Sequence, residues 1–395
     1  MRTHNLHIVS DENIPFVDEY FGRFGAICTV PAAQIDRHLV KGADALLVRS
    51  VTSVGRSLLE GTAVRFVGSA TAGCDHVDTS YLHGNGIRFA HAPGSNAGSV
   101  VEYVLAAAYL LGARTAQKIS GKTVGVVGCG QIGERVAERL ERVGCNVLRN
   151  DPPRAERNER TDFVSLNRVL DEAEIITLHT PLERSGDHPT FHLIDEAALR
   201  RMRPDVWLIN TSRGAVVESQ ALLAALRAGR LDAVVLDVWE SEPEISKDLL
   251  AAVAIGTPHI AGYSLDAKVR GTEMIADALA EWLGQRPSEA PMRPTFSIGV
   301  QPPDPGLPDD EALHFCIRQM YDVGQDDARM RRAIHDAELT GTVFRLLRKN
   351  YPERRSFDRY GIPDGTTSDA VGSLLADVIG MHRLPLGYPL EGKGR

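Results

Sequence analysis

The chain has 395 residues, more than one hydrophobic core usually supports, so its length predicts two or three domains. With 43% hydrophobic residues and a formal net charge of −8, the composition favours a globular protein and argues against binding to nucleic acid. Residues 100–113 form the longest apolar run, but they include Glu102 and are too few to span a membrane, and the N-terminus lacks an apolar secretory segment. The five cysteines lack metal-ligand spacing, which predicts reduced thiols, a cytoplasmic location and no bound metal.

Apolar runs alternate with helical segments over residues 1–96. Three strands are predicted, at residues 7–10, 45–48 and 64–68. This alternation is typical of a doubly wound parallel sheet, in which ligands bind at the carboxyl ends of the strands. Two polar loops follow the second and third of these strands, and their Ser50 and Thr71 fit substrate contact and helix capping equally well. We interpret residues 1–96, completed by residues 263–286, as a substrate-binding domain.

Residues 93–96, Pro-Gly-Ser-Asn, interrupt the pattern before a long apolar helix predicted at residues 97–111. Small polar residues at such a point make a plausible hinge, and the helix would carry the chain into a second domain. We place this second domain, a nucleotide-binding domain, at residues 97–262.

A glycine-rich stretch, residues 122–151, organises the second domain. Its apolar start predicts a buried strand, after which Gly128, Gly130 and Gly133 fit the pattern G-x-G-x-x-G at the beginning of an amphipathic helix. Free backbone amides and the helix dipole bind a pyrophosphate at such a place. Asp151 follows the next strand, where a carboxylate binds the adenosine ribose and repels a 2′-phosphate, so the pattern favours NAD over NADP.

Two alternatives remain open at this stretch. Arg149 and Arg154 flank Asp151 and are suited to receive the 2′-phosphate of NADP. The glycines also fit a tight turn without a ligand, but the order of strand, glycines, helix, strand and acid favours the cofactor.

Three further apolar runs predict parallel strands, at residues 175–178, 206–209 and 234–238. A polar cluster follows each run, and a fourth cluster begins at Thr257. The clusters are residues 179–181, 210–214, 237–243 and 257–263. Because the carboxyl ends of parallel strands share one edge of a sheet, we expect all four clusters to face the glycine loop.

These clusters contain the groups that oxidation of a 2-hydroxy acid requires. His259 is a candidate base for the alcohol proton, because imidazole titrates near neutral pH. Arg213 can hold a substrate carboxylate by a two-pronged contact, and Glu242 can bind the far ring nitrogen of His259 and fix its tautomer. Each residue also has a structural interpretation, since buried Arg and Glu often pair and a His can simply end a strand. Their joint occurrence in successive clusters favours catalysis.

The glycine pattern, the segment Asn-Thr-Ser-Arg-Gly at 210–214, Glu242-Pro243 and Pro258-His259 resemble the NAD-dependent D-2-hydroxy acid dehydrogenase family over residues 10–283. The resemblance implies an α/β fold with two doubly wound parallel-sheet (Rossmann-like) domains, and Arg213, Glu242 and His259 as catalytic residues. Further stretches resemble members that act on a small phosphorylated 2-hydroxy acid, and residues 344–355 resemble their small C-terminal α/β dimerisation domain. The implied partners are therefore this substrate and, in a homodimer, a second copy of the chain.

The same resemblance assigns binding residues. The substrate contacts would be Ser50, Thr71 and Tyr263. The NAD contacts would be Gly128, Gly130, Gln131, Ile132, Gly133, Asp151, Thr180, Thr211, Ser212, Arg213, Asp237 and Gly262.

The end of the chain, residues 287–395, begins with a proline-rich linker. Three helices are predicted beyond it, at residues 313–321, 343–347 and 373–381. They are too few to bury a core alone, which predicts packing against a second subunit. The basic run at 345–355 fits a solvated face, salt bridges between subunits, or a contact with the substrate phosphate through Arg348 and Arg354.

Two other functions compete with this interpretation. The first is another dehydrogenase of the family, acting on 3-phosphoglycerate or hydroxypyruvate, although the tail lacks the βαββαβ pattern common in phosphoglycerate enzymes. The second is a non-catalytic protein that senses NADH on the same fold.

Overall fold

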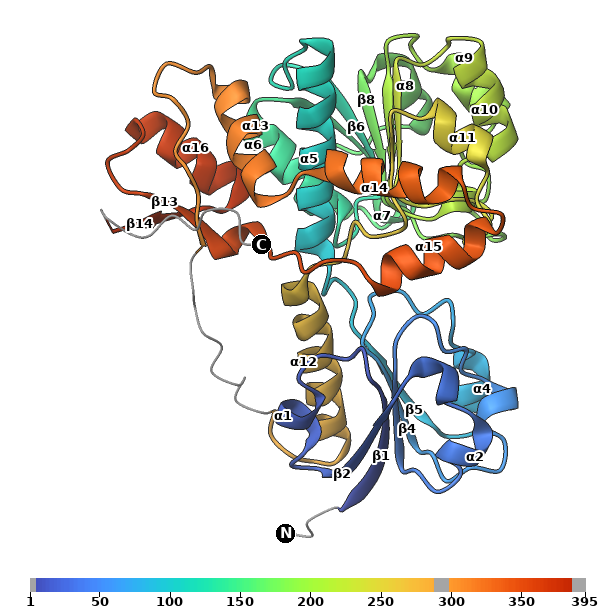
Figure 1. Ribbon diagram of the computed structural model, residues 1–395. Coiled ribbons are helices and arrows are strands. Elements are labelled where there is room, and N and C mark those ends of the chain that lie inside the picture. Colours follow the sequence, from blue (N-terminus) through green and yellow to red (C-terminus); the bar gives the residue numbers. More distant parts are fainter. Residues whose placement is uncertain (1–4, 288–297, 386–395) are drawn as a thin grey trace. The chain divides into compact units, whose positions relative to one another are not determined.

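The computed structural model describes residues 5–287 and 298–385, and the chain divides into two compact units. The first unit comprises Met1–Ala97 and Tyr263–Thr295, and the second comprises Gly98–Gly262 and Phe296–Arg395. Both units contain a parallel sheet with helices on its faces (Figure 1).

The first unit is built on a five-stranded parallel sheet in the order β2-β1-β3-β4-β5. Its strands are β1 (Leu6–Asp11), β2 (Gly25–Val30), β3 (Ala45–Val48), β4 (Phe66–Ser69) and β5 (Arg88–His91). Its helices are α1 (Val17–Phe21), a 3₁₀ turn (Ala32–Gln34), α2 (Arg37–Val40), α3 (Arg56–Leu59), α4 (Thr79–Gly84) and α12 (Leu265–Trp282). Leu46 and Leu47 of β3 are fully buried in different clusters, because successive side chains of a strand point to opposite faces. Ile275 and Leu279 of α12 pack in one of these clusters, and Leu82 of α4 packs in the other. Figure 1 shows α12 and α4 on opposite sides of the sheet.

The second unit contains a six-stranded parallel sheet in the order β11-β10-β9-β8-β6-β7. Its strands are β6 (Thr123–Val127), β7 (Asn146–Asn150), β8 (Ile175–Leu178), β9 (Trp207–Asn210), β10 (Ala233–Leu236) and β11 (Ile255–Gly256). Its helices are α5 (Ala97–Thr115), α6 (Gly133–Val143), α7 (Pro152–Glu156), α8 (Leu166–Glu172), α9 (Glu196–Arg201), a 3₁₀ turn (Gly214–Val216), α10 (Ser219–Arg227) and α11 (Lys247–Ala252). The strand order reverses between β6 and β8, and ligands of such sheets bind outside the carboxyl ends at that point.

The C-terminal segment belongs to the second unit. Its elements are β12 (Ile298–Gly299), α13 (Asp309–Met320), α14 (Val323–His335), α15 (Thr340–Lys349), a 3₁₀ turn (Phe357–Arg359), β13 (Tyr360–Pro363), α16 (Asp369–Ile379) and β14 (His382–Leu384). The three strands form a small parallel sheet in the order β12-β13-β14. Met330 and Ile334 of α14 and Phe344 of α15 are buried in the core cluster that also contains Leu236 of β10 and Trp239. These two helices are therefore part of the nucleotide-binding core.

The expected fold class is confirmed, with two Rossmann-like parallel sheets and a mixed α/β C-terminal segment. Several elements were not expected from the sequence, among them β2, β5, β11, α14 and the three short C-terminal strands. Both β2 and β5 are edge strands with partly exposed side chains, so their apolar pattern is weak. Part of the predicted linker, residues 288–297, lies outside the described residues.

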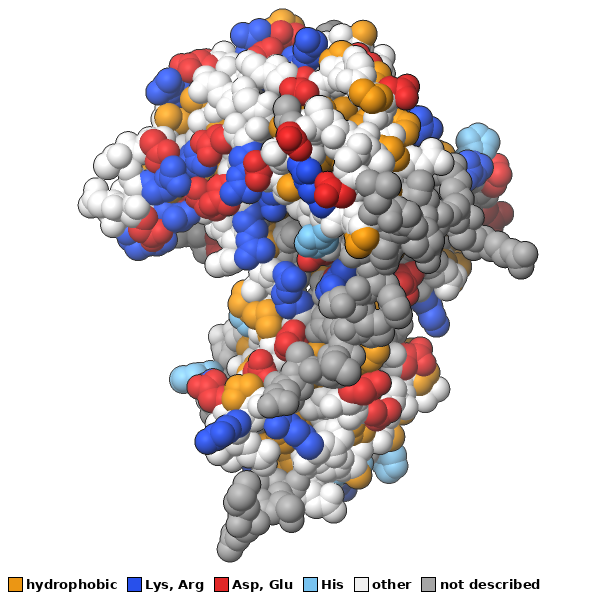
Figure 2. All heavy atoms as spheres, turned by 90° about the vertical axis from the view of Figure 1, so that its left-hand side faces the viewer, with side chains coloured by type: hydrophobic (Ala, Val, Ile, Leu, Met, Phe, Trp, Pro, Cys, Tyr) orange, Lys and Arg blue, Asp and Glu red, His pale blue; other side chains and the backbone are white. Residues whose placement is uncertain are grey.

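No helix in residues 5–287 or 298–385 is long and apolar enough to cross a bilayer. Figure 2 shows basic and acidic side chains interspersed over one face of the second unit. None of the five cysteines, all of which lie in the described residues, forms a disulfide.

Candidate active site

The glycine loop connects β6 to α6, and a different structural requirement favours glycine at each of its three glycine positions. Gly128 has a φ of +85°, a left-handed conformation that other residues rarely adopt. A Cβ on Gly133 would lie 1.9 Å from the carbonyl oxygen of Gly128, so only glycine allows α6 to begin this close to the loop. Gly130 is exposed, and no atom of the described residues would lie within 4 Å of a Cβ added there, which leaves its backbone open to approach. Turn, open approach and close packing are the three glycine roles of a dinucleotide loop.

Asp151 is fixed next to this loop. Its Oδ2 accepts a hydrogen bond from the backbone N–H of Cys129 at 2.9 Å, and its Oδ1 caps α7 through the N–H of Arg154 at 3.1 Å. The carboxylate therefore has a fixed place beside the expected ribose site. Burial raises the pKa of the Cys129 thiol to about 12, so this side chain stays protonated and is not a nucleophile.

The two arginines that flank Asp151 are engaged by carboxylates. Arg149 makes a two-pronged contact with Glu141, at 2.5 and 2.8 Å, and its Nε lies 3.2 Å from Glu134. Arg154 contacts Glu159 at 2.7 Å and Glu134 at 3.3 Å. All three side-chain nitrogens of Arg149 are engaged by carboxylates, and Arg154 is engaged through Nε and Nη1, which favours NAD.

The polar cluster after β8 supplies a neutral histidine and a buried hydroxyl. His179 is hydrogen-bonded to Thr177 at 2.9 Å and to Thr211 at 3.3 Å, and burial lowers its pKa to about 3. The Oγ1 atom of Thr180 is buried and has no hydrogen-bond partner within the described part of the chain. An orphaned buried hydroxyl at the switch point of the sheet fits a cofactor contact.

The loop after β11 is held by Asp237, which is fully buried. Its carboxylate accepts from the backbone N–H groups of Ile260, at 2.7 Å, and Ala261, at 2.9 Å, and from the hydroxyl of Thr257, at 2.7 Å. Burial raises the pKa of Asp237, and these bonds oppose that rise. Asp237 thus organises the loop that carries His259.

Glu242 and His259 form the central contact of the site. Their Oε1 and Nδ1 atoms are 2.5 Å apart, and the second carboxylate oxygen of Glu242 accepts from the N–H of Trp239 at 3.1 Å. Burial alone would raise the pKa of Glu242, but the charge and hydrogen bond of His259, the Trp239 N–H and the charge of Arg348 lower it below its usual range. The contact fixes the imidazole ring, which is about one-third exposed.

Arg213 lies on the neighbouring loop, directly after β9. The following residue, Gly214, packs so closely that a Cβ would lie 1.9 Å from the backbone of Trp239, the residue bound to Glu242. The loops after β9 and β10 are therefore in direct contact, and the N–H of His259 donates to the carbonyl of Asp237 at 2.7 Å. Within the second unit, the ends of three adjacent strands thus bring the Arg213, Glu242 and His259 segments together.

The predicted substrate contacts belong to the first unit. Ser50 is exposed after β3, and Thr71 follows β4, the strand next to β3, so both lie at the same edge of that sheet. The hydroxyl of Thr71 bonds to Ser69 at 2.6 Å and donates to the carbonyl of Gly73 at 2.8 Å. The ammonium group of Lys268 lies over the ring of Tyr263, 5.2 Å from the ring centroid.

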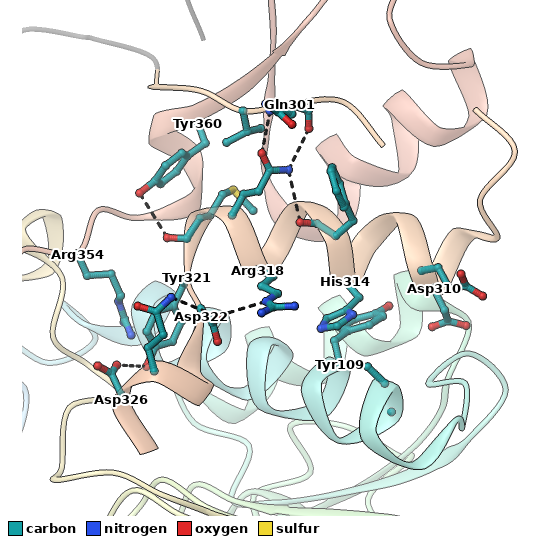
Figure 3. Close-up of a pocket in the computed structure, with 18 of the residues that line it drawn as sticks. Tyr109, Gln301, Asp310, His314, Arg318, Tyr321, Asp322, Asp326, Arg354 and Tyr360 are labelled. Atoms are coloured by element: carbon teal, nitrogen blue, oxygen red, sulfur yellow. Dashed lines mark hydrogen bonds and ion pairs between the residues drawn. The ribbon is translucent and has the colours of Figure 1, made fainter. Parts of the chain in front are cut away.

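A cavity of about 1680 Å³ lies elsewhere in the second unit (Figure 3). It is lined by α5, α13 and the segment around Arg354, and by none of the residues predicted for catalysis or cofactor binding. The cavity is therefore separate from the dehydrogenase chemistry described above.

Comparison with known proteins agrees with this geometry. Residues 106–261 match the NAD-binding domain of the D-isomer specific 2-hydroxyacid dehydrogenases, and residues 305–376 match a domain of unknown function. The TT0316 protein from Thermus thermophilus has a similar structure, with a TM-score of 0.62 and 27% identity over 72% of this chain and 99% of that one. A D-lactate dehydrogenase from Aquifex aeolicus, solved with NAD and lactic acid, shares the fold with a TM-score of 0.59 and 24% identity, over 70% of this chain and 95% of that one. The fold and the site thus define an NAD-dependent D-2-hydroxyacid dehydrogenase.

Curated relatives match nearly the whole chain. An erythronate-4-phosphate dehydrogenase from Salinibacter ruber is 48% identical over 91% of this chain and 94% of that protein. One from Edwardsiella ictaluri is 48% identical over 89% of this chain and 93% of that protein. The chain belongs to the erythronate-4-phosphate dehydrogenase family. The expected family, enzyme class and cofactor are confirmed, whereas the roles of individual residues remain predictions.

Proposed function

We propose that this protein oxidises the C2 hydroxyl of 4-phospho-D-erythronate to the 2-oxo acid, (R)-3-hydroxy-2-oxo-4-phosphooxybutanoate, a step of pyridoxine and pyridoxal 5′-phosphate biosynthesis. The relatives that match nearly the whole chain carry the name of this activity. The single structural observation that supports it most is the 2.5 Å contact between Glu242 and His259.

NAD, when bound, supplies the hydride acceptor. The backbone amides of the glycine loop and the N-terminus of α6 would hold its pyrophosphate, and Asp151 would bind its adenosine ribose. Thr180 would donate or accept through its orphaned hydroxyl. The remaining proposed contacts to the cofactor are Gln131, Ile132, Thr211, Ser212, Arg213, Asp237 and Gly262.

The residues of the chain divide the remaining chemistry. His259 takes the proton of the C2 hydroxyl at Nε2, the ring nitrogen that Glu242 does not contact, and the electron pair of that O–H bond becomes the second bond of the carbonyl as the C2 hydride leaves. The Glu242 carboxylate stabilises the imidazolium that forms. Arg213 grips the substrate carboxylate and so orients C2. Ser50, Thr71 and Tyr263 are the proposed contacts to the rest of the substrate.

The sequence offers Arg348 and Arg354, in the basic run at 345–355, as contacts to the substrate phosphate. The two side chains have different surroundings in the structure. Arg354 is buried and donates to two backbone carbonyl oxygens, so we do not assign it to the phosphate. Arg348 acts electrostatically on Glu242, as the lowered pKa of that carboxyl reflects.

We also propose that the protein is a cytoplasmic homodimer associated through the C-terminal segment. Phe315 of α13, Leu346 of α15 and Leu339 just before α15 expose 38%, 50% and 68% of their surface, respectively, which gives this segment apolar area for a partner. Five cysteines without a disulfide among the described residues suit a reducing compartment. Light scattering on the purified protein tests the dimer, and a monomer at micromolar concentration would contradict it.

Activity assays test the proposed reaction directly. Purified protein with NAD should reduce the cofactor with 4-phospho-D-erythronate at a kcat/KM well above that with 3-phosphoglycerate or D-glycerate, the reduced form of hydroxypyruvate. His259→Ala should abolish turnover and leave NAD binding intact. Binding of NADH without turnover of any 2-hydroxy acid would instead indicate a nucleotide-sensing protein.

A further inference from the structure

The chain passes between its two units at two described points, after Ala97 and after Gly262. A third passage falls within residues 288–297, outside the described residues. The first connection leads into α5, and the second follows the loop that carries His259.

A single side-chain nitrogen is hydrogen-bonded to a residue next to each of the two connections. Arg354, in the segment after α15, donates from Nη2 to the carbonyl oxygen of Ser99 at 3.0 Å and to that of Ala261 at 2.7 Å. Ser99 lies just beyond the first connection, and Ala261 lies just before the second. Two segments that are far apart in the sequence are therefore bound to the same guanidinium.

The guanidinium is itself fixed in place. Arg354 is only 6% exposed and stacks on the ring of Tyr321, 4.3 Å from its centroid. Figure 3 shows its side chain extending towards Tyr321 and Asp326, and the Asp326 carboxylate accepts from the hydroxyls of Tyr321, at 3.0 Å, and Tyr351, at 2.7 Å. Burial would lower the pKa of Arg354, but these neighbouring oxygens and Glu102 raise it, so the group stays charged.

The segment that carries Arg354 has a second attachment to α5. The backbone N–H of Phe357 donates to the carboxylate of Glu102 at 2.8 Å, in a buried contact one turn beyond Ser99. The C-terminal segment is thus attached to the start of α5 at two points, and Arg354 has little freedom to follow a displaced carbonyl.

Ala261 is held from both sides. Its N–H donates to the carboxylate of Asp237 at 2.9 Å, and its carbonyl accepts from Arg354 at 2.7 Å. His259 lies two residues earlier in the same loop, where its own N–H donates to the carbonyl of Asp237 at 2.7 Å. The orientation of the loop therefore depends on one carboxylate within the nucleotide-binding sheet and one guanidinium from the C-terminal segment.

We propose that Arg354 is a positioning residue that binds the start of α5 to the end of the His259 loop and so holds that loop in place. The consequence for turnover rests on the proposed role of His259, but the mechanical role of Arg354 does not. The C-terminal segment then contributes to catalysis within its own chain, in addition to any role in association.

Hydrogen exchange on the full-length protein separates this role from general packing. Arg354→Met keeps the apolar length and removes the donors, and Arg354→Lys keeps the charge but places its nitrogen one bond short of Nη2. Arg345→Met, at an exposed position of α15, is the matched control. We expect exchange to accelerate about tenfold or more in both segments, residues 98–103 and 257–262, in Arg354→Met, and to a smaller extent in both for Arg354→Lys. The control should exchange as the wild type does.

Kinetics supply the second measurement. In each folded Arg354 variant, kcat/KM should fall about tenfold or more while the pH at which activity rises stays unchanged, because the Glu242–His259 contact itself is intact. Wild-type exchange in either segment of a folded Arg354 variant, or the same acceleration in the control, would overturn the proposal. Hydrogen exchange does not depend on turnover. Absence of dehydrogenase activity would therefore refute the proposed function, while the exchange rates would still test the role of Arg354.

Discussion

Glu242→Gln removes the negative charge that faces His259 and keeps the shape of the side chain. In the wild type, Oε1 of Glu242 lies 2.5 Å from Nδ1 of His259. The side chain of Glu242 is 26% exposed, and that of His259 is 31% exposed. Two unit charges about 4 Å apart attract each other by about 4 kcal/mol at an effective dielectric constant of about 20. Partial exposure and the neutral hydrogen bond that Gln can still make reduce the expected loss to about 1.5–3 kcal/mol.

This loss predicts the direction of a change in the pH profile. The protonated form of the catalytic base loses the stabilisation that the Glu242 charge gives it. The base works when unprotonated, so kcat/KM for oxidation rises with pH, and this rise should move towards lower pH in the variant. Because the pKa of Glu242 is already lowered, its carboxylate stays charged through that rise in the wild type and loses its effect only at still lower pH. The plateau at high pH should fall about 10–100-fold, because the base is weaker and its ring is less well fixed.

The assay is the pH dependence of kcat/KM, followed by NADH formation. Glu240→Gln is the matched control. Glu240 lies in the same loop as Glu242 and makes a similar 2.5 Å contact with a histidine, but that histidine is His192 and not His259. The control should keep the wild-type midpoint. A midpoint for Glu242→Gln that stays in place or moves to higher pH would refute the electrostatic reasoning.

Three further predictions concern cofactor and substrate binding. Gly133→Ala places a Cβ 1.9 Å from a carbonyl oxygen and should lower both the melting temperature and NAD affinity, whereas Gly130→Ala should fold normally yet weaken NAD binding about tenfold or more. Thermal melts and NAD titrations compare the two, and normal NAD binding by Gly130→Ala would show that the open side of the loop is not the pyrophosphate site. Glu134→Gln weakens the ion pairs that engage Arg149 and Arg154, and Asp151→Ala removes the carboxylate proposed to bind the ribose. Each variant should reduce the ratio of kcat/KM with NAD to kcat/KM with NADP about tenfold. An unchanged ratio would disprove the proposed role of the substituted residue in cofactor selection. Arg213→Lys should raise KM for the hydroxy acid and lower kcat, because a single ammonium cannot reproduce the two-pronged contact; wild-type constants would remove Arg213 from the site.

The parts of the fold that the sequence predicts are those in which local pattern and burial agree. The central strands β3 and β8 are buried on both faces and, apart from Thr177 in β8, contain only apolar residues, so their positions follow from composition alone. The edge strands β2 and β5 lack such a pattern because one side of each faces solvent. The strand-end position of the His259 loop followed from the alternation of elements, since parallel strands place their carboxyl ends together.

The distances within the site depend on tertiary contacts that no local pattern encodes. That Arg149 is sequestered by Glu141 requires the end of β7 to lie against α6, and the sequence left this arginine as a candidate for a 2′-phosphate. The role of Arg354 was equally hidden, because its two carbonyl partners are contributed by distant segments of the chain. His179 stood in a recognised polar cluster, but only its burial between Thr177 and Thr211 shows that it is neutral.

Transfer of deuterium from C2 tests the central chemical claim most directly. 4-Phospho-D-erythronate labelled with deuterium at C2 should yield reduced NAD that carries the label, and kcat or kcat/KM should show a primary isotope effect if hydride transfer limits that constant. Arg213, Glu242 and His259 are all assigned to this one transfer. Label that appears in water, with unlabelled reduced cofactor, would contradict the assignment.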